Sequence, residues 1–213
     1  MNAVEHIITL STTPWVMWLM LFLLVLFVIA DIHQPKMWLT AWQMAFKRTD
    51  RVYNDAAIVG VGSLEQRLFC LLTGAFSWTV FFYKGGEFAL TYYLLITGCV
   101  LGWSLCRWGL RELIARIGKL KRYGFPNGYT MSLCLVLVSF LYLLNLGSIW
   151  IDRYTMVWRI GMAVVLAVWL ITIFIRHYQC FVHNWKTFLG LIAYWLTVEV
   201  GSLIGLYLLI SVL

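Results

Sequence analysis

The chain alternates between long apolar segments and shorter segments that carry the charged residues. A helix needs about 20 mainly apolar residues to cross the roughly 30 Å hydrocarbon core of a bilayer. The predicted spans are residues 14–30, 68–82, 88–105, 131–149, 157–175 and 188–209. The second span is the shortest, with an earlier start near Ser63 as the alternative. The pattern therefore predicts an all-α, polytopic membrane protein, a six-helix transmembrane bundle formed as a single domain by residues 1–213.

The basic residues are distributed unevenly between the segments that connect these spans. The first, third and fifth connections carry thirteen of the sixteen Lys and Arg residues, and the segments before the first span and after the last carry none. Because cytoplasmic loops are enriched in Lys and Arg, the odd-numbered connections are predicted to be cytoplasmic. Both termini are then expected on the non-cytoplasmic side of the membrane. The alternation holds for every connection, which supports the count of six spans.

Two cytoplasmic segments are predicted to be helical. The segment PKMWLTAWQMAFKR places Trp38 and Trp42 one turn apart between basic ends, a pattern typical of a helix lying in the membrane interface. The segment RWGLRELIARIGKLKR continues the third span into the cytoplasm as a helix with one apolar face. Its basic residues are candidates for binding anionic lipid headgroups, and an equally plain role is to set the topology. The candidate lipid-contacting residues are Trp38, Trp42, Arg111, Arg116, Lys119, Lys121 and Arg122.

The amino-acid composition also indicates that a lipid bilayer surrounds the protein. The chain is 62% hydrophobic and only 12% charged, whereas soluble domains have about a quarter of their residues charged. The net charge of +7 does not indicate nucleic-acid binding, because the basic residues lie between apolar segments, where topology requires them. The partners expected are the lipid bilayer, including its anionic lipids, and other membrane-protein subunits, with no nucleic acid.

Glu199 lies near the centre of the last predicted span and is the most informative single residue. A charged side chain at the centre of the membrane costs about 2.5–3.5 kcal/mol on insertion scales, and such side chains usually face the protein interior. It has either a structural role, holding helices together by hydrogen bonds, or a functional one, with a proton, an ion or a substrate. Counting about 1.5 Å per residue places several polar residues near it as candidate partners. These are Ser77, Thr79, Thr97, Tyr142 and, closer to the outer surface, Arg159. Asn145, in the outer half of the fourth span, is a further candidate for interhelical hydrogen bonding.

No motif indicates catalysis or a cofactor. The chain contains no HExxH, no phosphate-binding loop and no dinucleotide-binding fingerprint, and GVGSLEQ does not satisfy the G-x-S-x-G pattern. His177, Cys180 and His183 are competent metal ligands, but one straight helix cannot bring all three together. No metal and no cofactor are expected, and an enzymatic activity is not favoured. The five cysteines are scattered singly and are expected to be small buried apolar residues.

The stretch TFLGLIAYWLTVEVGSLIGLYLL, through Tyr194, Thr197 and Glu199, resembles the end of a Bacteroidota membrane-protein family, the domain-of-unknown-function family 4271. Where that family has a cysteine this chain has Trp195 or Leu196, and near Ser202 it lacks the family's proline. The resemblance is confined to the last span together with the general plan of several helices in a short chain. It implies a setting in the bacterial inner membrane and implies no activity.

Two functions follow as hypotheses. The first is a non-enzymatic inner-membrane protein, a subunit or accessory factor of a larger cell-envelope or protein-export complex, because no catalytic group of residues is present. The alternative is a small proton-coupled transporter or lipid-handling protein that uses Glu199 as its protonatable site. Many transporters contain inverted repeats and broken helices, and neither is evident in this sequence.

Overall fold

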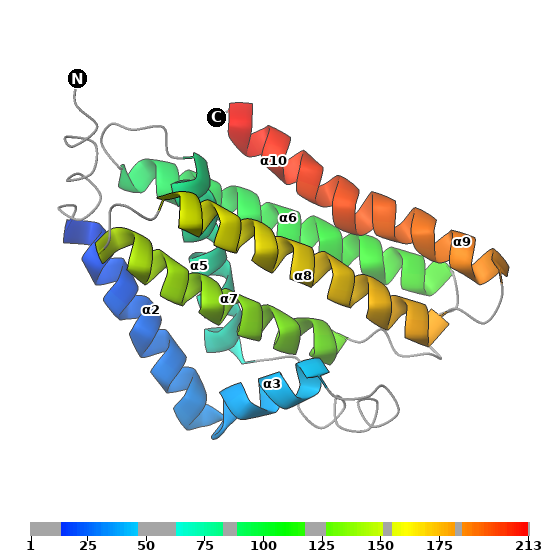
Figure 1. Cartoon of the computed structure of the whole chain (residues 1–213), viewed down its shortest axis with the longest axis horizontal. Helices are drawn as coiled ribbons and strands as arrows, with labels where there is room; N and C mark the ends of the chain where they lie inside the picture. Colours follow the sequence, from blue (N-terminus) through cyan, green and yellow to red (C-terminus); the bar gives the residue numbers. More distant parts are fainter. Residues whose placement is uncertain are drawn as a thin grey trace.

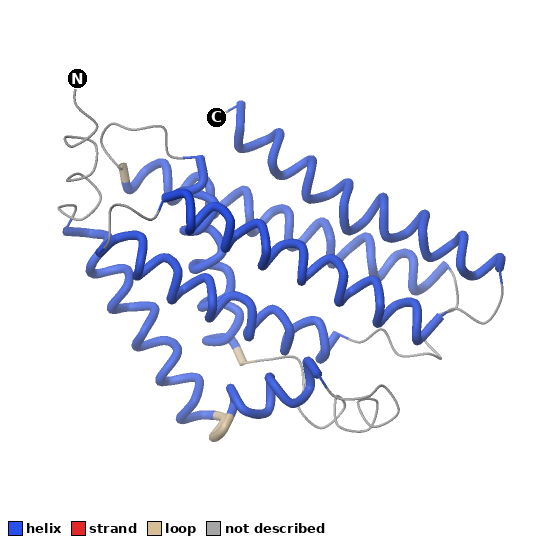
Figure 2. Tube along the Cα trace, viewed as in Figure 1, coloured by secondary structure: helices blue, strands red, loops and turns tan. Residues whose placement is uncertain are grey.

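A computed structural model describes residues 14–46, 63–82, 89–117, 127–150, 155–181 and 185–212. Within these ranges the regular structure is helical throughout (Figure 2). The helices are α2 (Pro14–His33), α3 (Met37–Phe46), α5 (Leu64–Phe82), α6 (Leu90–Ile117), α7 (Asn127–Trp150), α8 (Thr155–Phe181), α9 (Trp185–Tyr194), the π-helical segment η3 (Trp195–Gly201) and α10 (Ser202–Val212). This confirms the prediction of an all-α bundle.

The long helices run side by side and alternate in direction (Figure 1). The starts of α2, α6 and α8 and the ends of α5, α7 and α10 lie towards one end of the bundle (Figure 1). The end of α6, the start of α7 and the end of α8 lie at the other, together with the start of α9 (Figure 1). This is the arrangement expected when successive helices cross a membrane in opposite directions.

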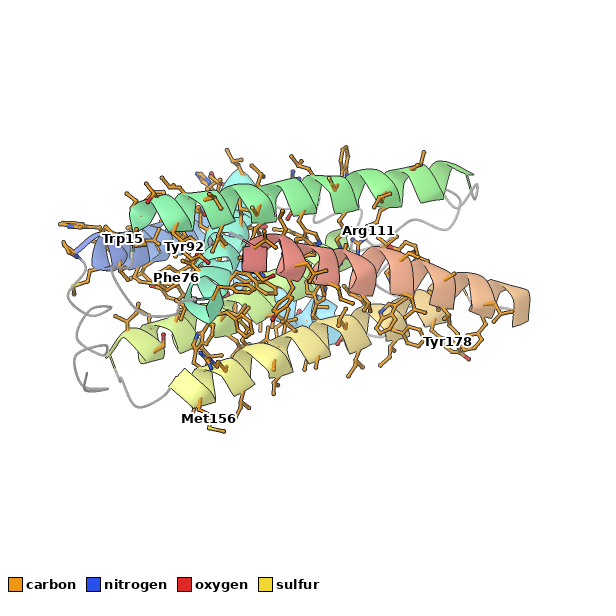
Figure 3. All side chains as sticks on the ribbon, turned by 90° about the horizontal axis from the view of Figure 1, so that it is seen from above. Trp15, Phe76, Tyr92, Arg111, Met156 and Tyr178 are labelled. Atoms are coloured by element: carbon orange, nitrogen blue, oxygen red, sulfur yellow. The ribbon has the colours of Figure 1, made fainter. Side chains whose placement is uncertain are left out.

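Among the described residues, five helices are long and apolar enough to cross a membrane: the segments Pro14–His33, Leu90–Arg111, Thr130–Ile149, Met156–Ile175 and Phe188–Val212. Large apolar side chains cover the outside of these helices. Trp18 is 70% exposed and Met156 is 73% exposed, and Met156 points away from the other helices (Figure 3). Because water disfavours so much exposed apolar surface, these faces are suited to lipid. The protein is therefore a multi-pass membrane protein.

Helix α5 carries the predicted second span but is not among those five segments. It begins at Leu64, in agreement with the earlier start near Ser63, and its first turn contains Glu65 and Arg67. The helix contacts α2, α6 and α7, and it buries polar as well as apolar side chains. A helix surrounded by other helices does not need an apolar surface all round, which explains the weak hydropathy signal of this segment. That α5 spans the membrane stays a prediction.

The segment around Trp38 and Trp42 is a helix as predicted, α3, and it packs against α7; its position in the membrane interface stays a prediction. The rings of Trp38 and Trp42 lie 6.4 Å and 6.3 Å from that of Phe140 on α7. The chain turns from α2 into α3 at Lys36, whose φ of 65° lies in the left-handed region. α3 therefore lies across the part of the bundle formed by α7.

Polar contacts join the end of α2 to the start of α5. Gln66 Nε2 donates to Gln34 Oε1 at 2.7 Å, and His33 Nδ1 lies 3.1 Å from Glu65 Oε1. A hydrogen bond to its own backbone N–H and another to Ser63 lower the pKa of Glu65. The contacts fix how α2 and α5 meet at the end where α3 also begins.

The last helix is continuous from α9 through η3 to α10, because Tyr194 and Ser202, which flank η3, both have right-handed helical dihedral angles. In a π-helix the backbone hydrogen bonds join residues five apart rather than four, and such segments occur often at functional sites. Glu199 lies within η3. The predicted last span is confirmed as a helix, and η3 is a local widening within it.

Candidate functional site, a buried arginine and glutamate cluster

Two arginines on α6 point into the bundle. Arg107 and Arg111 are four residues apart and therefore share one face of the helix. Their side chains are 9% and 11% exposed. Arg111 lies between α6 and the last helix (Figure 3). Burial of an arginine is costly without a partner, so the position of each side chain requires an acceptor.

Glu199 is that acceptor, and its side chain is 1% exposed. Arg107 Nη2 donates to Glu199 Oε2. Arg111 donates to the other carboxylate oxygen from Nη2 at 2.5 Å and from Nε at 3.2 Å. One carboxylate thus bridges two guanidinium groups, and charge-assisted hydrogen bonds of this kind are the strong ones. We refer to Arg107, Arg111 and Glu199 as the Arg–Glu–Arg cluster.

Tyr194 completes the polar contacts of the carboxylate, with its hydroxyl donating to Glu199 Oε1 at 3.3 Å. In an α-helix, residues five apart lie about 140° apart around the axis, which would keep these two side chains on different sides. The wider turn of η3 reduces that angle and brings Tyr194 and Glu199 together. The π-helical segment therefore determines the direction in which Glu199 points.

Aromatic rings enclose the cluster. The guanidinium carbon of Arg107 lies 5.2 Å from the ring centre of Trp103 on α6 and 5.1 Å from that of Trp169 on α8. Contacts at this range are favourable cation–π interactions. The buried ring of His177 lies 5.3 Å from the ring of Tyr194, and its Nδ1 forms a hydrogen bond with the backbone oxygen of Ile173. The site is built by α6, α8 and the last helix together.

Charge and hydrogen-bond donors are in excess within the cluster. Two guanidinium groups face one carboxylate, which leaves one net positive charge. Each guanidinium has five N–H donors, and Glu199 accepts three of the ten. Arg107 Nε and Trp103 Nε1 are buried and have no hydrogen-bond partner among the described residues. The arrangement is suited to accept a further anionic group.

The structure corrects the predicted placement of both arginines. Both residues are among the basic residues assigned above to the third connection, but they lie on α6 within the apolar segment Leu90–Arg111, with side chains only 9% and 11% exposed. Eleven of the sixteen basic residues remain in the odd-numbered connections, so the bias used to orient the chain persists. The side chain of Arg111 pairs with Glu199, and its contact with lipid headgroups stays a prediction.

The predicted partners of Glu199 lie elsewhere. Helix α6 brings Arg107, not Thr97, to the carboxylate, and these two residues are about 15 Å apart along the helix. Thr97 donates to the backbone oxygen of Tyr93, and Tyr142 donates to that of Met20 on α2. The depth estimate failed because it centred each predicted span, whereas α6 extends well beyond residue 105.

Two more predicted residues form a separate polar network with Trp158. Asn145 Nδ2 donates to Ser77 Oγ at 2.9 Å, and Asn145 Oδ1 accepts from Trp158 Nε1 at 2.9 Å. Asn145 is fully buried and joins α5, α7 and α8, which confirms its predicted role as an interhelical hydrogen-bonding residue. Arg159, the next residue after Trp158, is exposed on α8.

The remaining candidates are only partly described. Lys119, Lys121, Arg122 and His183 lie outside the described residues, as do the side chains of Arg116 and Cys180. Among the described residues no group of three or more His, Cys, Asp or Glu side chains could hold a metal ion.

The sequence did contain a signal for the cluster. Arg107 and Arg111 have helical spacing directly after an apolar run, on a segment whose pattern predicts a helix. A buried glutamate needs a cation, and these two arginines were available on a neighbouring helix. The pairing with Glu199 is missed when the two arginines are counted only as residues that set the topology. The positive-inside rule counts charges and does not consider which face of a helix carries them.

The fold and the cluster define a class, an all-α multi-pass membrane protein with a buried ion cluster between its helices. Comparison with protein families, curated protein sequences and solved structures finds no match to this chain. The resemblance of the last helix to family 4271 therefore stays a prediction, and the function must be argued from the site.

Proposed function

We propose that this is a non-enzymatic, lipid-handling protein of the bacterial cytoplasmic membrane, and that the Arg–Glu–Arg cluster binds the phosphate of an anionic lipid. The observation that carries the proposal is the buried surplus of positive charge, two guanidinium groups against one carboxylate. Basic sites between transmembrane helices near the cytoplasmic face are typical places for anionic headgroups. We also propose that six helices span the membrane, with both termini periplasmic.

The position of the cluster along the helices supports a headgroup ligand. Arg107 lies about 26 Å from the start of α6, and Glu199 lies about 20 Å from the end of α10. With those ends at the periplasmic face of a roughly 30 Å core, the cluster lies in the cytoplasmic half. Lipid phosphates border that half of the bilayer. Arg111, with 11% of its side chain exposed, provides the side from which the phosphate would approach.

The same geometry favours this proposal over a proton-carrying Glu199. The carboxylate already holds two guanidinium groups and accepts a hydrogen bond from Tyr194. Glu199 therefore positions the two arginines, and the arginines supply the positive charge that binds the phosphate. The accessory-subunit hypothesis stays a prediction from the sequence, and co-purification in mild detergent followed by mass spectrometry of associated proteins tests it.

The lipid proposal is tested with purified protein in nanodiscs that contain phosphatidylcholine and a minority of phosphatidylglycerol. Native mass spectrometry then counts the lipids that remain bound. The wild type should retain phosphatidylglycerol selectively, and Arg111→Gln should lower that retention about 10- to 100-fold, the equivalent of a charged hydrogen bond. Arg159→Gln, which removes an exposed arginine elsewhere, is the matched control and should retain the lipid.

Equal phosphatidylglycerol retention by the wild type and by folded Arg111→Gln would refute the lipid proposal. A titration with inorganic phosphate separates the two sources of a phosphate group. If inorganic phosphate displaces the bound lipid in this titration, the cluster takes a soluble anion instead of a headgroup.

A further inference from the structure

Two buried N–H groups on α6 lie at one contact and have no acceptor among the described residues. They are Nε of Arg107 and Nε1 of Trp103, on side chains one helical turn apart. The guanidinium carbon to which Nε is bonded lies 5.2 Å from the centre of the ring that contains Nε1. A buried donor without an acceptor costs about 1–3 kcal/mol. Two such donors at the same contact therefore indicate that a ligand supplies the acceptors.

The ligand must bring negative charge as well as acceptor atoms. Both oxygens of the Glu199 carboxylate already accept hydrogen bonds, Oε2 from Arg107 and Oε1 from Arg111 and Tyr194. This carboxylate offsets only one of the two guanidinium charges. A phosphodiester meets both needs, because its two non-bridging oxygens share one negative charge and can each accept from one of the two free donors.

The depth of the two donors limits the charge that the ligand can carry. Trp103 lies about 20 Å and Arg107 about 26 Å from the start of α6. In the orientation proposed above, both lie inside the cytoplasmic boundary of a hydrocarbon core about 30 Å thick. An uncompensated charge at that depth is costly. One negative charge brings the cluster to neutrality, whereas the second charge of a phosphomonoester would remain unpaired.

We infer that the Arg–Glu–Arg cluster and Trp103 together select anionic phosphodiester lipids, such as phosphatidylglycerol, over phosphomonoester lipids, such as phosphatidic acid. One non-bridging oxygen accepts from Arg107 Nε and the other from Trp103 Nε1. Phosphatidylcholine is disfavoured because its ammonium group would approach the same surplus positive charge. This inference rests on the proposed function, to which it adds the class of lipid and one specificity-determining residue, Trp103.

A matched pair of lipids isolates the effect of charge and needs no variant. Phosphatidylmethanol and phosphatidic acid differ by one methyl group, and the methyl ester holds the phosphate at one negative charge. Nanodiscs of phosphatidylcholine contain equal minorities of both, at a pH of about 8.5, well above the second pKa of about 6 for a phosphomonoester. Native mass spectrometry of the full wild-type chain should find phosphatidylmethanol retained about 10-fold or more over phosphatidic acid.

Trp103→Phe tests the indole donor, because phenylalanine keeps an aromatic ring beside Arg107 and removes the N–H. Loss of one hydrogen bond to a charged group should lower the retention of phosphatidylmethanol about 10-fold or more. A chain with benzothienylalanine in place of Trp103 keeps both rings, has sulfur where the N–H was, and should show the same loss. Trp108→Phe, at a side chain 63% exposed on the same helix, is the matched control and should retain the lipid.

Three results would overturn the inference. The first is retention of phosphatidic acid by the wild type that equals or exceeds that of phosphatidylmethanol. The second is unchanged retention of phosphatidylmethanol when Trp103 is replaced by either residue. The third is displacement of the lipid by dimethyl phosphate, a phosphodiester without acyl chains, which would identify a soluble anion as the ligand. The first two leave the anionic-lipid proposal in place, because that proposal fails only if wild type and Arg111→Gln retain phosphatidylglycerol equally or if a soluble anion is the ligand.

Discussion

Removing the carboxylate of the Arg–Glu–Arg cluster should cost far more stability than removing one of its arginines. In Glu199→Gln, two guanidinium groups that are 9% and 11% exposed lose their shared counter-charge. Breaking a buried ion pair by removing one partner costs about 3–5 kcal/mol, because an uncompensated charge stays behind. We expect Glu199→Gln to lower the free energy of unfolding by at least that amount.

Arg111→Gln presents the opposite case. It loses charged hydrogen bonds to Glu199 that are worth about 1.5–3 kcal/mol. It also relieves repulsion from Arg107, one helical turn away. At about 6 Å with an effective dielectric of about 20, that repulsion is about 3 kcal/mol. The two terms nearly cancel, so Arg111→Gln should change stability by about 1 kcal/mol or less.

The assay is unfolding in mixed micelles with increasing dodecyl sulfate, followed by the fluorescence of the twelve tryptophans. The Glu199→Gln transition should shift clearly to lower denaturant, while Arg111→Gln stays near the wild type. A combined Arg107→Met, Arg111→Met and Glu199→Leu variant should recover most of the loss, because an apolar replacement leaves no buried charge. If Arg111→Gln costs as much as Glu199→Gln, the cluster has no surplus of positive charge and the reasoning fails.

Three other predictions concern the interhelical contacts, the π-helical segment and the topology. Asn145→Leu should lower the unfolding free energy by about 1–2 kcal/mol, because it breaks the hydrogen bonds that join α5, α7 and α8; no loss relative to wild type in the same assay would contradict this. Gly201→Ala should destabilise η3, because the added Cβ would lie 3.0 Å from the backbone oxygen of Leu196, whereas Gly205→Ala meets nothing within 4 Å and should be neutral. Equal melting temperatures for the two glycine variants would argue against a π-helical segment. Ser211→Cys in a cysteine-free chain should react with a membrane-impermeant maleimide in intact cells, and protection there would reverse the proposed orientation.

The lipid-facing and membrane-spanning character of this protein could be predicted from the sequence. Segments such as residues 14–30 and 157–175 are apolar all round, and no soluble fold can hide that surface. The helical extension beyond the third span and the short helix at Trp38 also followed from periodicity. These features are local, because each depends on one segment and its solvent.

Prediction was weakest where a helix is surrounded by protein. Helix α5 carries Glu65, Gln66 and Arg67 near its start and lies among three other helices. Its environment is set by those neighbours, so neither hydropathy nor length defines it. The same cause explains Asn145, whose polarity was evident but whose partners Ser77 and Trp158 come from two other helices.

The sequence by itself determined that Glu199 would need a partner inside the bundle, since a charged group in lipid must be compensated. Only the tertiary structure decided which partner. The length of α6, the wider turn of η3 and the packing of α8 together bring Arg107 and Arg111 to the carboxylate, and the packing of α5 on α7 joins Ser77 to Asn145. These pairings depend on the relative depth and rotation of separate helices. A single sequence contains no direct record of either quantity, because both arise when the helices pack.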